Sequence, residues 1–305
     1  MDSHTHAAKL MRRAAIASVC VAMLLTLTKA GAYLASNSVA MLASMADSAL
    51  DLLASAANFI AIRTSLAPAD QEHRFGHGKA EPLAGLMQSA FITASAMFLL
   101  VQSVDRLIAP QPIENSSIAL AVMTVSIVCT FFLVWYQQHA IKASRSTAIA
   151  ADRMHYVGDL ASNIAVIIAI GLAAWFGWLW ADPLLAIGVA GLLLWSAFKV
   201  GRDSLDQLMD RELPDEDRAA ILAVITGHPQ VRSVRELKTR KSGLSTFIQA
   251  DITLDGGMSL DAAHCVTDAL EDSLARAFPG AQAVIHQEPA PSSASTAATP
   301  PPARP

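Results

Sequence analysis

Two aspartates interrupt an apolar stretch of the chain in the segment Ser44-Met45-Ala46-Asp47-Ser48-Ala49-Leu50-Asp51. The stretch runs from residue 38 to residue 62, and about 20 predominantly apolar residues suffice to cross the ~30 Å hydrocarbon core of a bilayer as a helix. Carboxylates four residues apart share one helix face. An ionised aspartate at the centre of such a helix costs about 2.5 to 3.5 kcal/mol. The segment therefore predicts a membrane-spanning helix whose carboxylates need a compensating cation.

Five further stretches have a similar length and polarity. They cover residues 14–34, 83–108, 117–138, 148–174 and 178–200. The chain of 305 residues is 53% hydrophobic and 16% charged, whereas soluble domains carry about 25% charged residues. This composition excludes a pair of water-soluble globules, and no block of the chain has the positive excess that a nucleic-acid partner requires. We predict an all-α bundle of six transmembrane helices over residues 14–202, after an N-terminal segment of residues 1–13.

The distribution of Lys and Arg predicts the orientation of the bundle. Basic residues precede the first stretch and follow the second, fourth and sixth stretches, whereas the opposite side has only Arg106. Connections rich in Lys and Arg stay in the cytoplasm. We therefore expect both termini in the cytoplasm, and turns near Ser36, at 109–116 and near Gly177 on the other side. The first stretch reads as an uncleaved helix rather than a signal peptide.

The composition changes after Arg202. Residues 203–288 carry 15 Asp and Glu against 8 Lys and Arg, and Pro and Gly separate short periodic segments. The periodicities predict helices at 215–226 and 259–278, and strands at 231–239, 246–254 and 281–286. This order predicts an α+β domain, an open sheet with helices on one face. Residues 289–305 contain six prolines and are predicted to be a disordered tail.

The fifth apolar stretch repeats the spacing of the second, because His155 and Asp159 are four residues apart. A single buried Asp or His is more often hydrogen-bonded within a bundle than bound to metal. Here the chain has two pairs with the same spacing, Asp47 with Asp51 and His155 with Asp159. Two matched pairs favour a shared metal site. Nitrogen and oxygen donors at about 2.0 to 2.2 Å suit Zn²⁺, and oxygen-rich sets also accept Fe²⁺ or Mn²⁺.

Three other charged residues lie in or beside the predicted spans. Lys29 has no lone pair to donate, so we interpret it as a snorkelling or internally paired residue. Asp152 and Arg153 are expected at the cytoplasmic end of their helix. There they pair with each other or with loop charges, and we assign them no role.

Two more groups of residues have metal-ligand chemistry. The loop between the second and third stretches contains Asp70, His73 and His77, which can form a site, although loops of this kind are commonly just solvated. In the acidic domain, side-chain direction can bring together four residues from strands and a helix, and four separate surface residues are an equal alternative. They are Asp251, His264, His286 and Glu288.

The motifs are accompanied by three more specific segments. They are His73-Arg74-Phe75-Gly76-His77-Gly78-Lys79-Ala80-Glu81-Pro82, Phe247-Ile248-Gln249 and Ile285-His286-Gln287. Together with the two spaced pairs, they resemble the cation diffusion facilitator family, in its bacterial zinc/ferrous-iron efflux branch. The resemblance covers residues 10–289.

The resemblance implies a homodimer in the bacterial inner membrane, in which each six-span protomer carries a ferredoxin-like (metallochaperone-like) cytoplasmic domain. It implies efflux of divalent metal in exchange for protons, with Zn²⁺ as transported and regulatory ion, Fe²⁺ or Cd²⁺ as other candidates, and no organic cofactor. Three metal sites are implied. They are the transport site Asp47, Asp51, His155 and Asp159, the loop site Asp70, His73 and His77, and the cytoplasmic-domain site Asp251, His264, His286 and Glu288, with Gln287 as an addition.

The chain departs from the family pattern in its acidic domain. Arg235 stands where relatives have a His, and Asp251 and Glu288 stand where His and Asp are more usual. Arg cannot ligate a metal, so the number of metal ions in this domain stays open. The domain binds two metal ions, or it binds one, or Arg235 forms a salt bridge that substitutes for a metal ion. The resemblance also suggests a charge interlock between Lys79 and Asp210, with an incidental surface pair as the alternative.

Protons and metal ions compete for the same lone pairs in this interpretation, because metal ligands must be deprotonated. The predicted function is therefore proton-coupled antiport of a divalent cation. An intramembrane metalloprotease needs a general-base Glu near the metal, and Glu81, at a helix entrance, is the only Glu in or beside the spans. An enzyme is thus disfavoured. A metal-sensing membrane scaffold that binds without transport stays open as the alternative.

Overall fold

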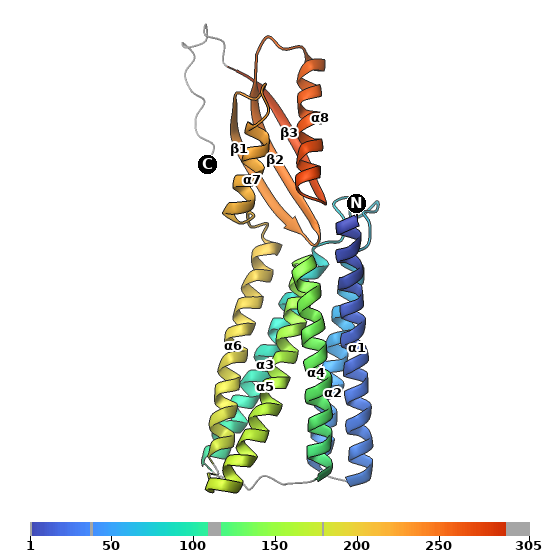
Figure 1. Ribbon diagram of the computed structural model, residues 1–305, viewed down its shortest axis with the longest axis vertical. Helices are drawn as coiled ribbons and strands as arrows, with labels where there is room; N and C mark the ends of the chain where they lie inside the picture. Colours follow the sequence, from blue (N-terminus) through green and yellow to red (C-terminus); the bar gives the residue numbers. More distant parts are fainter. Residues whose placement is uncertain (1, 37–38, 109–116, 179, 291–305) are drawn as a thin grey trace. The chain divides into compact units, whose positions relative to one another are not determined.

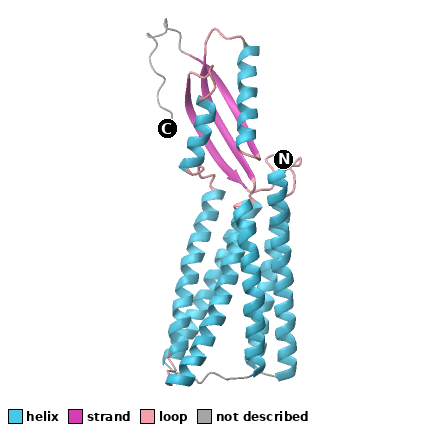
Figure 2. Cartoon of the chain, in the orientation of Figure 1, coloured by secondary structure: helices cyan, strands magenta, loops and turns pink. Residues whose placement is uncertain are grey.

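The computed structural model describes residues 2–36, 39–108, 117–178 and 180–290. The chain divides into two compact units, Met1–Met209 and Asp210–Pro305. Figure 2 shows long helices in the first unit and a sheet with two helices in the second. Each unit buries hydrophobic clusters of its own. The division separates the apolar part of the sequence from the acidic part.

Within the described residues, six helices are long and apolar enough to cross a membrane, and they form the bundle drawn in Figure 1. They are α1 (Asp2–Ser36), α2 (Val39–Ser65), α3 (Ala80–Ile108), α4 (Ser117–Ser144), α5 (Thr147–Phe176) and α6 (Ala181–Leu208). Large apolar side chains such as Phe98, Phe132 and Trp195 are 60% exposed or more, as expected where lipid covers a helix surface. The predicted six-helix bundle is confirmed.

Several helices extend beyond the apolar stretches that predict them. Helix α1 already begins at Asp2, and α6 continues through polar residues to Leu208. Apolar composition marks where a helix meets hydrocarbon, whereas the backbone hydrogen-bond pattern continues into water until a residue ends it. The predicted turn at 109–116 and the predicted tail from residue 291 onward lie outside the described residues.

Small residues bring α3 and α6 close together. A Cβ atom placed on Gly85 of α3 would lie 2.5 Å from Ser204 Oγ of α6. In return, a Cβ atom on Gly201 of α6 would lie 3.0 Å from Ser89 Oγ of α3. Each helix therefore supplies one glycine and one serine, and such small-residue interfaces allow helix backbones to approach closely in membranes.

Polar contacts join the loop before α3 to two other helices. Glu81, which is buried at the start of α3, accepts a hydrogen bond of 2.7 Å from the backbone N–H of Thr147 at the start of α5. Lys79 donates to the carbonyl oxygen of Leu208, at the end of α6, over 3.2 Å. A carboxylate at a helix N-terminus and a cation at a C-terminus both complement the helix dipole and satisfy groups that have no intrahelical partner.

The C-terminal unit has the predicted order of helices and strands. Its elements are α7 (Asp215–Thr226), β1 (Ser233–Ser242), β2 (Ser245–Leu254), α8 (Leu260–Ala277) and β3 (Ala281–Pro289). The sheet order is β1-β2-β3, with an antiparallel pair β1–β2 and a parallel pair β2–β3. Gly243, at a φ of 59°, forms the turn of the hairpin. Ser259 caps α8, because its Oγ accepts the N–H of Ala262.

One face of the sheet forms the core of this unit. Ile248 and Ile252 of β2 are fully buried against Ile225 of α7 and Leu270 of α8. Because strand side chains alternate between faces, the odd-numbered residues of β2 lie on the face without helices. The predicted α+β domain is confirmed, but the bounds of the strands differ. Strand β1 begins at Ser233 rather than at residue 231 and continues to Ser242, β2 begins at Ser245 rather than at residue 246, and β3 continues to Pro289.

Candidate metal centres

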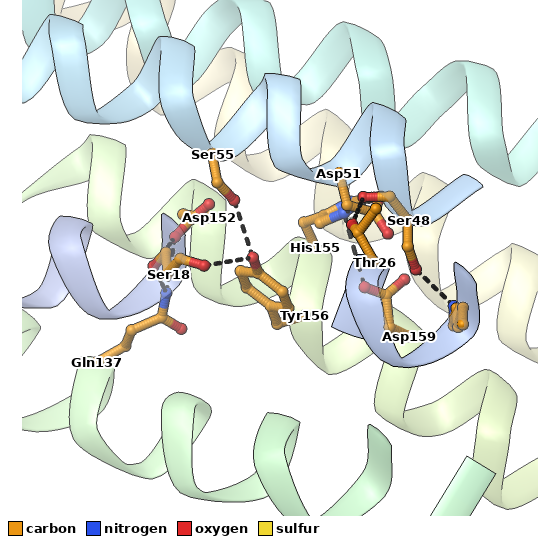
Figure 3. Close-up of polar contacts among 11 residues, drawn as sticks. Ser18, Thr26, Ser48, Asp51, Ser55, Gln137, Asp152, His155, Tyr156 and Asp159 are labelled. Carbon is orange, nitrogen blue, oxygen red and sulfur yellow. Dashed lines mark hydrogen bonds and ion pairs between the residues drawn. The ribbon is translucent and has the colours of Figure 1, made fainter. Parts of the chain in front are cut away.

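Helices α2 and α5 carry the four residues of the predicted transport site. Three of them converge, because His155 Nε2 lies 2.9 Å from Asp51 Oδ1 and 3.6 Å from Asp159 Oδ2. One donor atom from each of these three residues lies within 4.8 Å of the other two. Figure 3 shows His155 of α5 beside Asp51 of α2, with Asp159 one helical turn further along.

Asp47, the fourth predicted residue, lies one turn before Asp51 and outside this group of three. It is exposed, but it lines the same cavity as the other three residues. The cavity has a volume of about 640 Å³ and is also lined by Ser44 and Asn163. All four predicted side chains therefore border one space within the bundle.

The three converging donors match the requirements of a small divalent cation. Four ligand atoms placed tetrahedrally at 2.0–2.2 Å from Zn²⁺ lie about 3.4 Å from one another, which is close to the two separations measured around His155. The imidazole is nearly buried, whereas Asp51 and Asp159 keep 18% and 36% of their side-chain surface accessible. The site thus combines a nearly buried imidazole with two partly accessible carboxylates that border the cavity.

Lys29 of α1 also lines the cavity. Its Nζ donates to Ser48 Oγ of α2 over 2.5 Å, so it is internally paired, which was one of the two interpretations of the sequence. An ammonium group cannot ligate a metal. Its charge instead offsets part of the negative charge of the carboxylates that line the cavity.

The loop between α2 and α3 brings Asp70, His73 and His77 together. Asp70 Oδ2 lies 3.2 Å from His77 Nε2, and Asp70 Oδ1 lies 3.5 Å from His73 Nδ1. The three donor atoms lie within 4.8 Å of one another. Gly76, at a φ of 80°, makes the turn between the two histidines. The loop therefore places three ligand-type side chains around one point.

Backbone hydrogen bonds hold the carboxylate of this loop in place. The N–H of His73 donates to Asp70 Oδ1 over 2.6 Å, and the N–H of Glu72 donates to the same atom over 2.9 Å. The bond from His73 is the main cause that lowers the pKa of Asp70, because it stabilises the ionised form. Asp70 is therefore a deprotonated donor at neutral pH.

The residues predicted for a site in the C-terminal unit are distributed over three elements of the fold, β2, α8 and β3. Asp251 and His286 are direct neighbours on the parallel strands β2 and β3, whereas His264 lies on α8, 3.6 Å from Asp268. In the part of the chain that the structure describes, no three of the predicted residues bring their donor atoms within 4.8 Å of one another. The described residues of this unit therefore do not bring the predicted set together at one point.

Arg235 makes the salt bridge that the sequence left as an alternative. Its Nη1 pairs with Glu288 Oε2, which joins β1 to β3 across the central strand. Arg235 lies at an irregularity in the pairing of β1 with β2, between Val234 and Glu236. One carboxylate of the predicted metal site is therefore already neutralised by a cation of the chain itself.

Asp152 lies in the second turn of α5, near the helix end as predicted, but the predicted pairing with Arg153 or with loop charges was wrong. Asp152 is 1% exposed and accepts hydrogen bonds from Ser18 of α1 and Gln137 of α4. A signal for this position does exist in the sequence, because Asp152 lies three residues before His155 and so on the same side of the helix. The predicted pair of Lys79 and Asp210 joins residues of different units and stays a prediction; within the second unit Asp210 pairs with Arg240 at 3.2 Å.

Comparison with known proteins identifies both units. The family model of the cation efflux transmembrane domain matches residues 15–209, and that of the cation efflux protein cytoplasmic domain matches residues 213–290. The cation-efflux pump FieF of Citrobacter koseri is 42% identical over 281 residues, which cover 92% of this chain and 93% of the relative. The FieF pumps of Salmonella arizonae and Klebsiella pneumoniae are 41% and 40% identical to this chain, and the matches again cover 92% of this chain and 93% of each relative.

The two family matches follow one another along the chain and together account for both structural units. The relatives extend over nearly the whole sequence, so the likeness is not confined to one part of the fold. The chain therefore belongs to the cation efflux family, the cation diffusion facilitators, and is a multi-pass membrane transporter of cations.

Proposed function

We propose that this protein exports divalent metal ions from the cytoplasm in exchange for protons, with Zn²⁺ as the foremost cargo. Transport takes place at Asp47, Asp51, His155 and Asp159 by alternating access. The observation that supports this most is the convergence of Asp51, His155 and Asp159 at a cavity inside the six-helix unit. Cation efflux itself follows from the family, and the site suggests which residues carry it.

The charges around the cavity suit a dication. Three carboxylates and one ammonium group line it, so a neutral imidazole leaves a net charge of about −2 when the carboxylates are ionised. Charged groups in a membrane are costly unless they are compensated. A divalent cation neutralises this excess, and a monovalent cation does not.

Protons and the metal compete for the same donor atoms. When the site faces the cytoplasm, deprotonated ligands bind the metal. When the bundle opens to the other side, protons driven by their gradient occupy His155 and at least one aspartate, and the metal dissociates. Only a difference in affinity between the two conformations can drive this cycle. A shared site couples the two ions because it cannot hold both at once.

Asp47 is the proposed fourth ligand. It lies on the same face of α2 as Asp51 and lines the same cavity. A tetrahedral zinc site takes four donors, and Asp47 is the carboxylate that would complete the set. Its exposure suits a residue that first meets the arriving ion and joins the other three when the metal binds.

Flux measurements on reconstituted vesicles test this function. Proteoliposomes that contain a pH dye receive Zn²⁺, Fe²⁺, Cd²⁺ or Mn²⁺ in turn, because carboxylates and one imidazole accept several of these ions. Metal uptake is expected to drive proton movement in the opposite direction, fastest with Zn²⁺. Metal flux without proton movement contradicts antiport. Equilibrium binding without any flux favours the metal-sensing scaffold instead.

The family match and the distribution of charge suggest the arrangement of the protein in the cell. We place both termini in the cytoplasm of a bacterium and the bundle in its inner membrane, on the basis of the Lys and Arg content of the connections. The C-terminal unit matches the cytoplasmic domain of cation efflux proteins. We assign it the role of joining two protomers into a homodimer.

The acidic character of the C-terminal unit suggests a metal-dependent contact between protomers. Residues 203–288 have seven more acidic than basic residues, so two such units repel each other until cations bind at Asp251, His264, His286 and Glu288. The salt bridge of Arg235 with Glu288 occupies one of these carboxylates, which favours one metal rather than two. We expect added zinc to shorten the distance between fluorophores attached to the two C-terminal units. A distance that does not respond to zinc contradicts this role.

The loop site is expected to bind one metal ion independently of the transport site. Replacing His77 by alanine removes the donor that lies 3.2 Å from Asp70, and about one zinc ion per chain should be lost. The measurement is zinc per chain after gel filtration. His139→Ala is the matched control, because His139 is an exposed histidine of α4 outside both sites. An unchanged zinc count in His77→Ala would remove this site from the proposal.

A further inference from the structure

A buried carboxylate lies beside the transport site and has no role in the mechanism above. Asp152 of α5 is 1% exposed. Its Oδ2 accepts a hydrogen bond of 2.6 Å from Ser18 Oγ of α1 and one of 2.7 Å from Gln137 Nε2 of α4. Figure 3 shows this cluster on the side of Tyr156 away from Asp51 and Asp159. Three helices therefore meet at one carboxyl group.

The cluster has more acceptors than donors. Asp152 Oδ1 and Gln137 Oε1 are both buried, and neither has a hydrogen-bond partner among the described residues. Unpartnered buried acceptors cost free energy, and a buried carboxylate needs a cation or several donors to stay ionised. The donors here come from a hydroxyl and an amide, both neutral. A proton on Asp152 removes the uncompensated charge.

Ser18 can accommodate both protonation states of Asp152. Its Oγ lies 2.6 Å from Asp152 Oδ2 and 3.1 Å from the carbonyl oxygen of Ala14. When Asp152 is ionised, the Ser18 hydroxyl donates to the carboxylate. When Asp152 carries a proton on Oδ2, the carboxylic acid donates to Ser18 Oγ, and the hydroxyl turns to donate to Ala14. Rotation of one hydroxyl thus serves either state without movement of the backbone.

The cluster is close enough to the transport site to respond to a metal ion there. Asp152 precedes His155 by three residues, which places the two side chains about one helical turn apart. His155 and Tyr156 of α5 and Asp51 of α2 interact with Asp152 electrostatically. Helices α1 and α4 face it with neutral Ser18 and Gln137. Tyr156 lines the transport cavity and donates to the carbonyl oxygen of Ser18 over 3.3 Å, which connects the two regions.

We propose that Asp152 is a second proton-binding site of the transporter, occupied when the metal site is empty and vacated when a divalent cation binds beside it. This inference rests on the proposed function. The positive charge of the ion at Asp51, His155 and Asp159 favours an ionised Asp152 and repels its proton. The O–H bond of the carboxylic acid breaks, the electron pair stays on the carboxylate, and the proton passes to water. Each metal ion therefore exchanges for one proton more than its own ligands release.

Proton release on metal binding tests the proposal. The full-length protein in detergent, in weakly buffered solution with a pH indicator, is titrated with Zn²⁺ at several pH values. Asp152→Asn keeps the size of the side chain but cannot titrate, and about one proton fewer should be released per chain when zinc fills its sites. Because the loop site and the C-terminal unit are unchanged, the difference between the proteins isolates Asp152. Asp105→Asn, at an exposed carboxylate of α3, is expected to match the unsubstituted protein.

A second variant covers the case in which Asp152→Asn does not fold. Ser18→Ala keeps the carboxylate but removes the hydroxyl that serves its two states, and the pH at which the extra proton is released should shift. The proposal is overturned if the folded variants, Asp152→Asn or Ser18→Ala, release as many protons as the unsubstituted protein and show the same pH profile. An unsubstituted protein that binds zinc without releasing any proton contradicts the proposed antiport as a whole, which is a different outcome.

Discussion

Replacement of Asp51 by alanine is expected to abolish zinc-driven proton flux. Asp51 Oδ1 lies 2.9 Å from His155 Nε2 and is one of the three converging donors. Loss of even an outer partner of a metal ligand costs roughly 10- to 100-fold in affinity or activity, so loss of a ligand should cost about 100-fold or more. The measurement is the rate of internal pH change in proteoliposomes after addition of zinc.

The matched control for this variant is Asp105→Ala. Asp105 is an exposed aspartate of α3, so its loss removes an equal charge without touching the donors. It should leave the flux within about twofold of the unsubstituted rate. Near-normal flux in Asp51→Ala would exclude this cluster as the transport site. Binding of zinc by the same variant, measured separately, shows whether the loop site and the C-terminal unit still fold.

Replacement of His155 by aspartate is expected to change which metal is carried. His155 is the one nitrogen donor among the four proposed ligands. An all-oxygen site suits harder ions such as Mn²⁺, whereas imidazole favours Zn²⁺. We expect the ratio of manganese flux to zinc flux to rise by roughly tenfold or more. The measurement compares the initial rates for the two metals in the same preparation of vesicles.

His155→Ala distinguishes a change of preference from a general loss. It removes the nitrogen without adding an oxygen, so transport of both metals should fall. If His155→Asp and His155→Ala give the same flux ratio, residue 155 does not contact the ion. The ring of Tyr156 packs edge-on against the ring of His155, with the ring centroids 5.6 Å apart. The thermal stability of both variants is therefore measured as well, to detect any change in this packing.

Much of the fold can be predicted from the sequence because local rules decide it. Six apolar stretches predict the six helices, and the four-residue spacing predicts which side chains share a face of α2 and of α5. The rotation of α2 against α5 cannot be predicted in this way, because packing with the other helices sets it. That rotation decides that Asp51 contacts His155, while Asp47 lies outside the group of three.

Asp152 shows a second limit of the sequence. Its partners Ser18 and Gln137 are 134 and 15 residues away along the chain, and neither residue type marks a buried network by itself. Polar residues within apolar stretches indicate that something is buried, but they do not indicate with what. In the C-terminal unit, the sequence left a salt bridge of Arg235 open as an alternative but did not identify Glu288 of β3 as its partner, because strand pairing decides which side chains meet.

The reciprocal glycine and serine contacts between α3 and α6 restrict how the bundle can rearrange. Helices packed this closely have little room to slide or rotate against each other, since any shift brings a hydroxyl into the opposing backbone. In the alternating access proposed above, we therefore expect this helix pair to move as one rigid body, with relative movement at the helices that supply the ligands. Over generations, a bulkier residue at position 85 should be accepted only together with a smaller one at position 204, so the two sites should co-evolve.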